Sequence, residues 1–160
     1  MQVHASPPRT VSTPPAAPTL LRRRDDATRS ELLDRYAAHG GLASTTDIVS
    51  LMRVYWRQPI SMLSHWIVNR KVVSFTCRGE ILLPLFQFLR PRMTPHDCVQ
   101  EVAARLADLM DDEGLGAWFV RPSEWLGHAM PVDLVVADPA AVLGAARRTR
   151  ERLLASRCAG

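Results

Sequence analysis

The sequence has few cysteines, no long apolar run and no apolar segment at its N-terminus. Cys77, Cys98 and Cys158 are an odd number at irregular spacing, so they predict neither a disulfide framework nor a zinc motif. A reducing, cytoplasmic setting fits them best. No apolar run approaches the ~20 residues of a membrane-spanning helix, and no secretion-type apolar core is present. These absences favour a soluble cytoplasmic protein without a membrane partner.

Short motifs of catalysis and cofactor binding are absent as well. The sequence contains no phosphate-binding loop, no dinucleotide-binding glycine motif, no H-E-x-x-H and no G-x-S-x-G. The five histidines fall in different segments, and no pair has the spacing of metal ligands. His128 has no nucleophile or orienting carboxylate near it in sequence, which favours a hydrogen-bonded loop histidine over a catalytic base. We therefore predict a protein that is not an enzyme, with no catalytic residues, no metal site and no cofactor.

What the sequence does have is apolar content and arginine. With 160 residues, 47% of them hydrophobic, the chain is long enough for one domain with a tail or for two very small domains. The net charge is +4, and arginine supplies nearly all of the positive charge. This balance permits nucleic-acid binding, although an arginine-rich solvated surface has the same composition.

Changes in composition divide the chain into three segments. Residues 1–27 are rich in proline and poor in apolar groups, so we predict a disordered tail. Its Arg22–Arg24 run is either a phosphate-contacting arm or a solvated charge run beside Asp25 and Asp26. Residues 28–90 are predicted to form a helical module with a β-hairpin, and residues 91–160 a small all-α domain. The fold class is therefore mainly α, with the outline of a winged helix-turn-helix in the second segment.

The second segment has clear start and stop signals. Thr28 and Ser44 each begin a sequence with capping-box spacing, and Pro59 is a favourable first-turn residue for a third helix. Residues 72–88 then change to an alternating pattern with a turn at Arg78–Gly79, which predicts a hairpin. Gln87 lies among its apolar residues and would need hydrogen-bond partners if buried.

One stripe of the third helix has the residue types that read DNA. Arg, Asn, Ser and Lys side chains on one helix face contact phosphates and base edges. The alternative is an ordinary polar helix face whose last cations complement the helix dipole. The candidate DNA-binding residues are Arg57, Ser61, His65, Asn69, Arg70 and Lys71, together with Arg78 at the hairpin tip.

The third segment begins with Thr94 as a predicted N-cap and Pro95 in the first turn of a helix that reaches about Asp111. The acidic residues 111–113 would end this helix, which is electrostatically unfavourable unless a partner or a nearby arginine offsets them; a plain exposed acidic turn is the favoured alternative. Asp138 and Pro139 start a last helix rich in arginine. That helix suits a nucleic acid or an acidic protein groove, or is simply a solvated helix.

Between these helices lies a connector, residues 118–134, with the sequence WFVRPSEWLGHAMPVDL. Pro122 and Pro131 disfavour helix at the residues before them, so the connector cannot be one continuous helix. A connector with such large apolar groups either packs against its own domain or is covered by a partner. The candidate partner-binding residues are Trp118, Arg121, Trp125, Leu126, His128 and Met130.

The connector resembles the toxin-binding domain of the Xre/MbcA/ParS antitoxin family, whose pattern is roughly W-L-x-x-P-N-x-x-L-x-G-x-x-P-x-x-L. The spacing from Trp118 through Pro122 and Leu126 to Pro131 agrees with it. Ser123 stands where asparagine is usual, and His128 where the second glycine is usual. The segment LPLFQF resembles an element that often precedes this domain, so the resemblance extends from about Leu82 to the C-terminus.

The resemblance implies an antitoxin of a bacterial toxin–antitoxin system. Its partner would be a cognate toxin, commonly a RES-domain enzyme that acts on NAD, and it would bind its own promoter DNA and form a homodimer. An alternative is a stand-alone transcription regulator that uses the C-terminal domain for dimerisation. A small enzyme is the third reading, disfavoured by the missing catalytic motifs.

Overall fold

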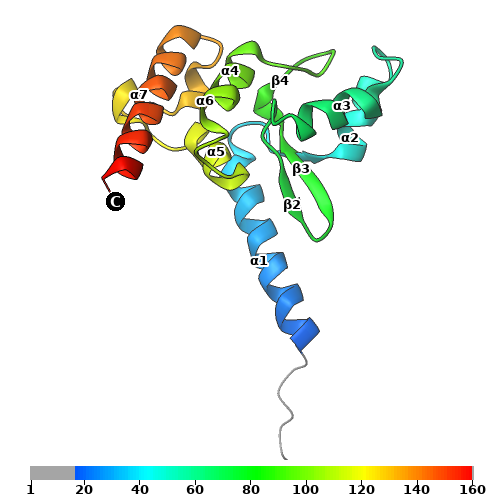
Figure 1. Ribbon diagram of the computed structural model, residues 1–160. Coiled ribbons are helices and arrows are strands. Elements are labelled where there is room, and N and C mark those ends of the chain that lie inside the picture. The colour runs from blue at the N-terminus through cyan, green and yellow to red at the C-terminus, as the bar shows by residue number, and fades with distance from the viewer. Residues whose placement is uncertain (1–16, 160) are drawn as a thin grey trace, which may run out of the picture.

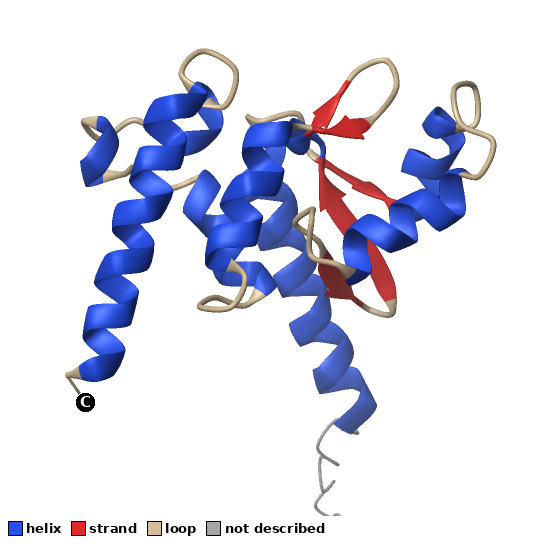
Figure 2. Cartoon of the chain, turned by 45° about the horizontal axis from the view of Figure 1, so that its top comes forward, coloured by secondary structure: helices blue, strands red, loops and turns tan. Residues whose placement is uncertain are grey.

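The computed structural model describes the chain from residue 17 to residue 159, with side chains described from Asp26 onward. This part is mainly helical, as predicted, with seven α-helices around small antiparallel sheets (Figures 1 and 2). The α-helices are α1 (Ala17–Ala37), α2 (Thr45–Met52), α3 (Pro59–Val68), α4 (Asp97–Leu106), α5 (Asp112–Phe119), α6 (Pro131–Leu134) and α7 (Pro139–Cys158). The strands are β1 (Leu42–Ser44), β2 (Phe75–Cys77), β3 (Glu80–Pro84), β4 (Phe88–Leu89) and β5 (Thr94–Pro95). Two 3-10 helices, η1 (Leu85–Gln87) and η2 (Glu124–Leu126), complete the set.

The predicted hairpin is confirmed as β2 and β3. Cys77 pairs with Glu80, so Arg78 and Gly79 form a two-residue turn. Both have positive φ, 55° and 76°, as a tight hairpin turn between right-twisted strands requires. A third strand, β1, pairs with β3 and gives the sheet order β1-β3-β2. This short strand has no alternating pattern, and nothing in the sequence predicts it.

The predicted helix starts at Ser44, Pro59 and Asp138 are also confirmed. The Ser44 and Asp47 side chains form a capping box at α2, and Pro59 occupies the first turn of α3. The Asp138 carboxylate accepts a hydrogen bond from the Ala141 N–H at 3.0 Å and caps α7.

Two predicted boundaries differ in the structure. Helix α1 begins at Ala17, so residues 17–27 are helical where the sequence predicts disorder; residues 1–16 of that segment lie outside the described residues. Ion pairs of α1 with the hairpin, Arg29 with Glu80 at 2.7 Å and Asp26 with Arg78, hold the helix against the sheet. These partners are about 50 positions away, which is why the local composition misses them.

The helix predicted to run from Thr94 to about Asp111 is shorter at both ends in the structure, where α4 spans Asp97–Leu106. Thr94 and Pro95 lie in β5, which pairs with β4, and His96 is the N-cap of α4. The acidic residues 111–113 begin α5 instead of ending α4, and the Asp111 carboxylate accepts from the Gly114 N–H at 2.7 Å. Negative charge at a helix N-terminus is favourable, so the predicted electrostatic penalty does not arise.

Two hydrophobic cores lie on either side of the sheet region. The first contains Leu32 and Tyr36 of α1 and Phe75 of β2, together with apolar residues of α4, α5 and α7. Thus residues from both sides of position 90 share one core. The second core is formed by α2, α3 and β3, and by Phe88 and Met93.

Gln87 lies fully buried and satisfies the expectation that it needs partners. Its amide nitrogen donates to the Val73 carbonyl at 2.8 Å, and its Oε1 accepts from the Val73 N–H at 2.7 Å. The amide thus replaces a strand partner for one buried residue of the first core.

Candidate partner-binding site

The candidate site is built on the connector between α5 and α6, and its first fixed point is Trp118 in α5. The indole packs edge-on against Phe119, with ring centroids 5.1 Å apart, and is half buried. Its Nε1–H donates to Oγ1 of the buried Thr149 in α7 at 3.1 Å. This bond fixes α7 beside α5 and anchors one wall of the site.

The chain after α5 folds into a closed loop from Ser123 to Ala129. The Ser123 N–H donates to the Ala129 carbonyl at 3.0 Å, and the Ser123 carbonyl accepts from the N–H groups of Leu126 and His128. Gly127 and His128 both have left-handed backbone, with φ of 60° and 69°. This conformation suits glycine and is strained for histidine. The loop displays η2 on the surface of the protein.

Trp125 in η2 is 37% exposed and lies beneath two arginines of α7. The guanidinium carbons of Arg148 and Arg152 are 5.4 and 5.8 Å from its ring centroid, a cation–π arrangement. Arg152 also forms an ion pair with Glu124, the residue before the tryptophan. The indole therefore keeps an exposed part that is surrounded by positive charge.

A surface pocket of about 520 Å³ opens beside these residues. It is lined by Met110, Gly114, Trp118, Arg121, Pro122, Ser123, Glu124, Trp125, His128, Thr149, Arg152 and Leu153. Three arginines at or above the pocket, Arg121, Arg148 and Arg152, outnumber its one carboxylate, Glu124. The site is therefore aromatic and cationic, and it suits a surface that carries carboxylates.

The structure brings four of the six predicted partner-binding residues to this pocket: Trp118, Arg121, Trp125 and His128. Leu126 and Met130 are half buried and are not among its lining residues. The sequence patterns did not single out Thr149 and Leu153, and Arg152 is only one member of the last helix, which is rich in arginine. No local signal shows which face of α7 lies against the connector.

Helix α7 is positioned by a second polar link, to the end of α4. Arg150 makes two bonds to the Asp108 carboxylate, at 2.6 and 3.0 Å. The hydrogen bond from Arg150 lowers the pKa of Asp108 below its usual value. This link turns Arg150 toward α4 and leaves Arg148 and Arg152 over Trp125.

The predicted DNA-binding residues fall into two groups in the structure, those with exposed side chains and those engaged in contacts within the protein. Ser61 and His65 lie exposed on α3, and Arg57 and Lys71 lie exposed on either side of it. The Asn69 amide is bonded back to the His65 carbonyl at 2.8 Å. Helix α3, with the sequence PISMLSHWIV, contains no arginine or lysine, and His65 is its one basic residue.

Two of the predicted DNA-binding cations are engaged within the protein. Arg70 bonds to Asp112 at 2.8 Å and to the carbonyls of Ala107 and Met110, which ties α3 to the α4–α5 connection. Arg78 forms the ion pair with Asp26 of α1. These two side chains hold elements of the fold together.

Within the described residues, no group of three His, Cys, Asp or Glu side chains could hold a metal ion. No described helix is both long enough and apolar enough to cross a membrane. Comparison of the chain with protein-family models, with curated proteins and with solved structures gives no match.

Proposed function

We propose that this chain is an antitoxin-like protein whose Trp125 pocket binds and neutralises a partner toxin, a RES-domain enzyme by the family resemblance. The observation that carries the proposal is the exposed Trp125, held by a closed loop and surrounded by arginines in a pocket. A partly exposed tryptophan in a pocket with arginine neighbours has the composition of a binding hot spot. The charge around it favours a toxin surface that carries carboxylates.

The backbone of the loop supports the family resemblance. Position 128 has φ of 69°, a conformation that favours glycine, and the family pattern has glycine there. Pro131 occupies the first turn of α6, so this proline of the pattern begins a helix. Thus the glycine and the proline of the family pattern both fall at positions where the backbone of this chain favours those residue types.

The experiment is co-expression with the product of the adjacent reading frame, which would be the cognate toxin. The chain should restore growth and form a complex, and NAD should be preserved if the toxin is of the RES type. Trp125→Ala should weaken the complex by about thirtyfold, because a desolvated tryptophan contributes ~2 kcal/mol or more. Leu33→Ala is the control, since Leu33 is 42% exposed on α1, away from the pocket.

Equal affinity of the wild type and a folded Trp125→Ala variant would remove the pocket from the interface. No complex with, and no protection from, the adjacent product would count against the antitoxin function itself.

Promoter-DNA binding is the second candidate function, on its own or beside toxin binding. Its support is the order of elements, α2, α3 and then the β2–β3 hairpin, which is that of a winged helix-turn-helix. With Arg70 and Arg78 engaged in the fold, Arg57 and Lys71 are the exposed cations among the predicted DNA-binding residues. A Lys71→Ala variant should then weaken a salt-sensitive complex with promoter DNA. Unchanged affinity would exclude this contact.

A further inference from the structure

A second exposed surface lies on α2 and α3 and shares no lining residue with the Trp125 pocket. Of the ten exposed large hydrophobic side chains among residues 26–159, five lie in this short stretch: Leu51, Val54, Tyr55, Ile60 and Val68. Val68 is 80% exposed and Ile60 61%. Two of the five, Ile60 and Val68, line the same groove. Exposed apolar groups gathered on one surface mark a protein interface, whereas single exposed residues would not.

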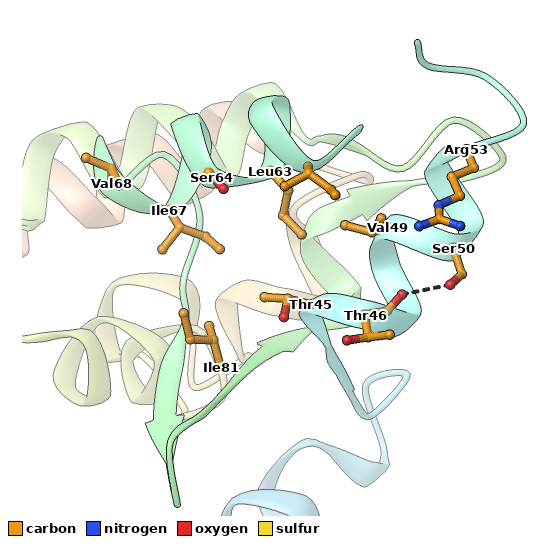
Figure 3. Close-up of a pocket in the computed structure, with 11 residues that line it drawn as sticks. Thr45, Thr46, Val49, Ser50, Arg53, Leu63, Ser64, Ile67, Val68 and Ile81 are labelled. Carbon is orange, nitrogen blue, oxygen red and sulfur yellow. Dashed lines mark hydrogen bonds between the residues drawn. The ribbon is translucent and has the colours of Figure 1, made fainter. Parts of the chain in front are cut away.

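The surface has a groove and a ridge side by side. The groove, about 450 Å³, lies between α2 and α3, and Val49, Leu63, Ile67 and Ile81 point into it (Figure 3). Ile60, Ser64 and Val68 are four residues apart along α3 and form an exposed ridge at the rim of the groove, whose lining includes them. Rows at this spacing are the ridges that pack against another helix surface.

A ridge beside a groove makes this surface complementary to itself. In a twofold dimer the same patch serves both copies, so the ridge of each copy enters the groove of the other. Among the described residues that line the groove, Arg53 is the one charged residue, so like-charge repulsion is small when the patch meets itself. The Trp125 pocket, with its three arginines, would repel a second copy of itself.

Charge along α2 gives such a dimer its direction. Asp47 lies exposed in the first turn of α2 and Arg53 lies exposed at its C-cap. If two copies meet with their α2 helices antiparallel, the Arg53 end of each α2 would face the Asp47 end of the other, where the Asp47 carboxylate also accepts a hydrogen bond from the Ser44 hydroxyl. This arrangement adds two charge-complementary contacts at the rim of the apolar patch.

We propose that the α2–α3 surface is the interface through which two copies of this chain form a twofold dimer, with the ridge of Ile60, Ser64 and Val68 in the partner's groove. The exposed face of α3 is then covered and does not read base edges. DNA contacts, if formed, would be made by residues beside it. The proposal does not depend on toxin binding, since it concerns the chain alone.

The test is the mass of the purified full chain, measured by sedimentation equilibrium over a range of concentrations. The wild type should be a dimer of the 17.9 kDa chain. Val68→Asp should weaken dimerisation by at least about a hundredfold, because it buries an unpaired carboxylate. Val136→Asp is the matched control: Val136 is 78% exposed on the α6–α7 connection, so it should leave the dimer unchanged.

Both valines are so exposed that neither substitution removes packing inside one chain, and circular dichroism of each variant checks folding. Arg53→Glu gives a second, milder test and should weaken the dimer about tenfold by placing like charges at both rim contacts. A monomeric wild type overturns the proposal. It does so even if DNA or another protein is then found to cover this surface. A Val68→Asp variant that dimerises like the wild type overturns it, and so does equal loss of dimer in Val136→Asp.

Discussion

The two exposed apolar surfaces of this protein differ mainly in charge. The Trp125 pocket carries Arg121, Arg148 and Arg152 around one partly exposed indole. The α2–α3 surface has more exposed aliphatic groups, but its groove contains one arginine among hydroxyl and aliphatic side chains. Exposed hydrophobic residues indicate that a partner covers a surface, and the charge around them indicates the kind of partner. The charge of the first surface favours an acidic partner, whereas the near-neutral second surface is compatible with a second copy of the chain.

The largest effects are expected when one substitution in each surface is tested against both interactions, singly and in a double variant. Val68→Asp should weaken dimerisation by at least about a hundredfold while leaving affinity for the proposed toxin within about twofold. Trp125→Ala should weaken the complex with the proposed toxin about thirtyfold while leaving the dimer intact. The two surfaces are separate in the fold, so their effects should be additive. Sedimentation and binding titrations on the two variants and the double variant measure this. If each substitution impaired both interactions, the two surfaces would be one interface.

The two surfaces also lie on different hydrophobic cores, and the first core contains a tyrosine that should make stability depend on alkaline pH. Burial raises the pKa of Tyr36 in the first core from 10.0 to about 12. Below pH 10 both the folded and unfolded chains hold this proton. Between pH 10 and 12 the unfolded chain releases it and the folded chain does not, so stability falls as pH rises, by about 3 kcal/mol in all.

Tyr36→Phe should remove this part of the pH dependence and change stability little at pH 7. Its hydroxyl is buried without a hydrogen-bond partner in the described part of the chain, so losing it leaves no new unsatisfied group. Urea unfolding of both proteins at pH 7 and pH 11 measures the difference. A parallel pH dependence of the two would show that Tyr36 is not responsible.

Arg70 joins the two cores, and its removal tests whether it serves the fold or a DNA surface. Arg70→Ala should lower the free energy of unfolding by about 1–2 kcal/mol, since it leaves carbonyls near the end of α4 without their donor. This value allows for the side chain being about one-third exposed. Its neighbour Lys71 is exposed, and Lys71→Ala should cost less than about 0.5 kcal/mol. Thermal unfolding of both would contradict this role if the two losses were equal.

The smallest expected difference between the two surfaces is in the salt dependence of their complexes. The toxin complex should weaken by about tenfold between 0.05 and 0.5 M NaCl, because its charge complementarity is screened. The dimer, which is mainly apolar, should change by less than about threefold over the same range. The same titrations repeated at each salt concentration give both values, and a stronger salt dependence for the dimer would reverse the assignment of the two surfaces.

Much of the fold could be predicted from local patterns. The capping box at Ser44, the start at Asp138 and the turn at Arg78–Gly79 were all readable, because each is fixed by residues within a few positions of one another. The early start of α1 and the strand β1 were not, since they depend on pairing with the hairpin dozens of positions away. The acidic residues 111–113 were assigned to the wrong helix end, because spacing alone does not show on which side of a break a charge lies.

The candidate site shows the same limit. Trp118, Arg121, Trp125 and His128 were found because one connector carries them all. Thr149 comes from a helix whose rotation against α5 is decided by packing, and no pattern in α7 reveals it. Likewise, the sequence presents Arg70 and Arg78 as free cations, and their partners Asp112 and Asp26 follow from the fold alone.

The closed loop around Trp125 has one more consequence, for the speed of recognition. Backbone hydrogen bonds join Ser123, at the start of the loop, to Ala129 at its end and to Leu126 and His128 between them. The tryptophan is therefore held in a preformed loop before any partner arrives. A preformed segment loses little conformational freedom on docking and needs no folding step after first contact. Encounter with an oppositely charged surface would then be limited by diffusion and orientation, which would favour fast capture of the proposed toxin.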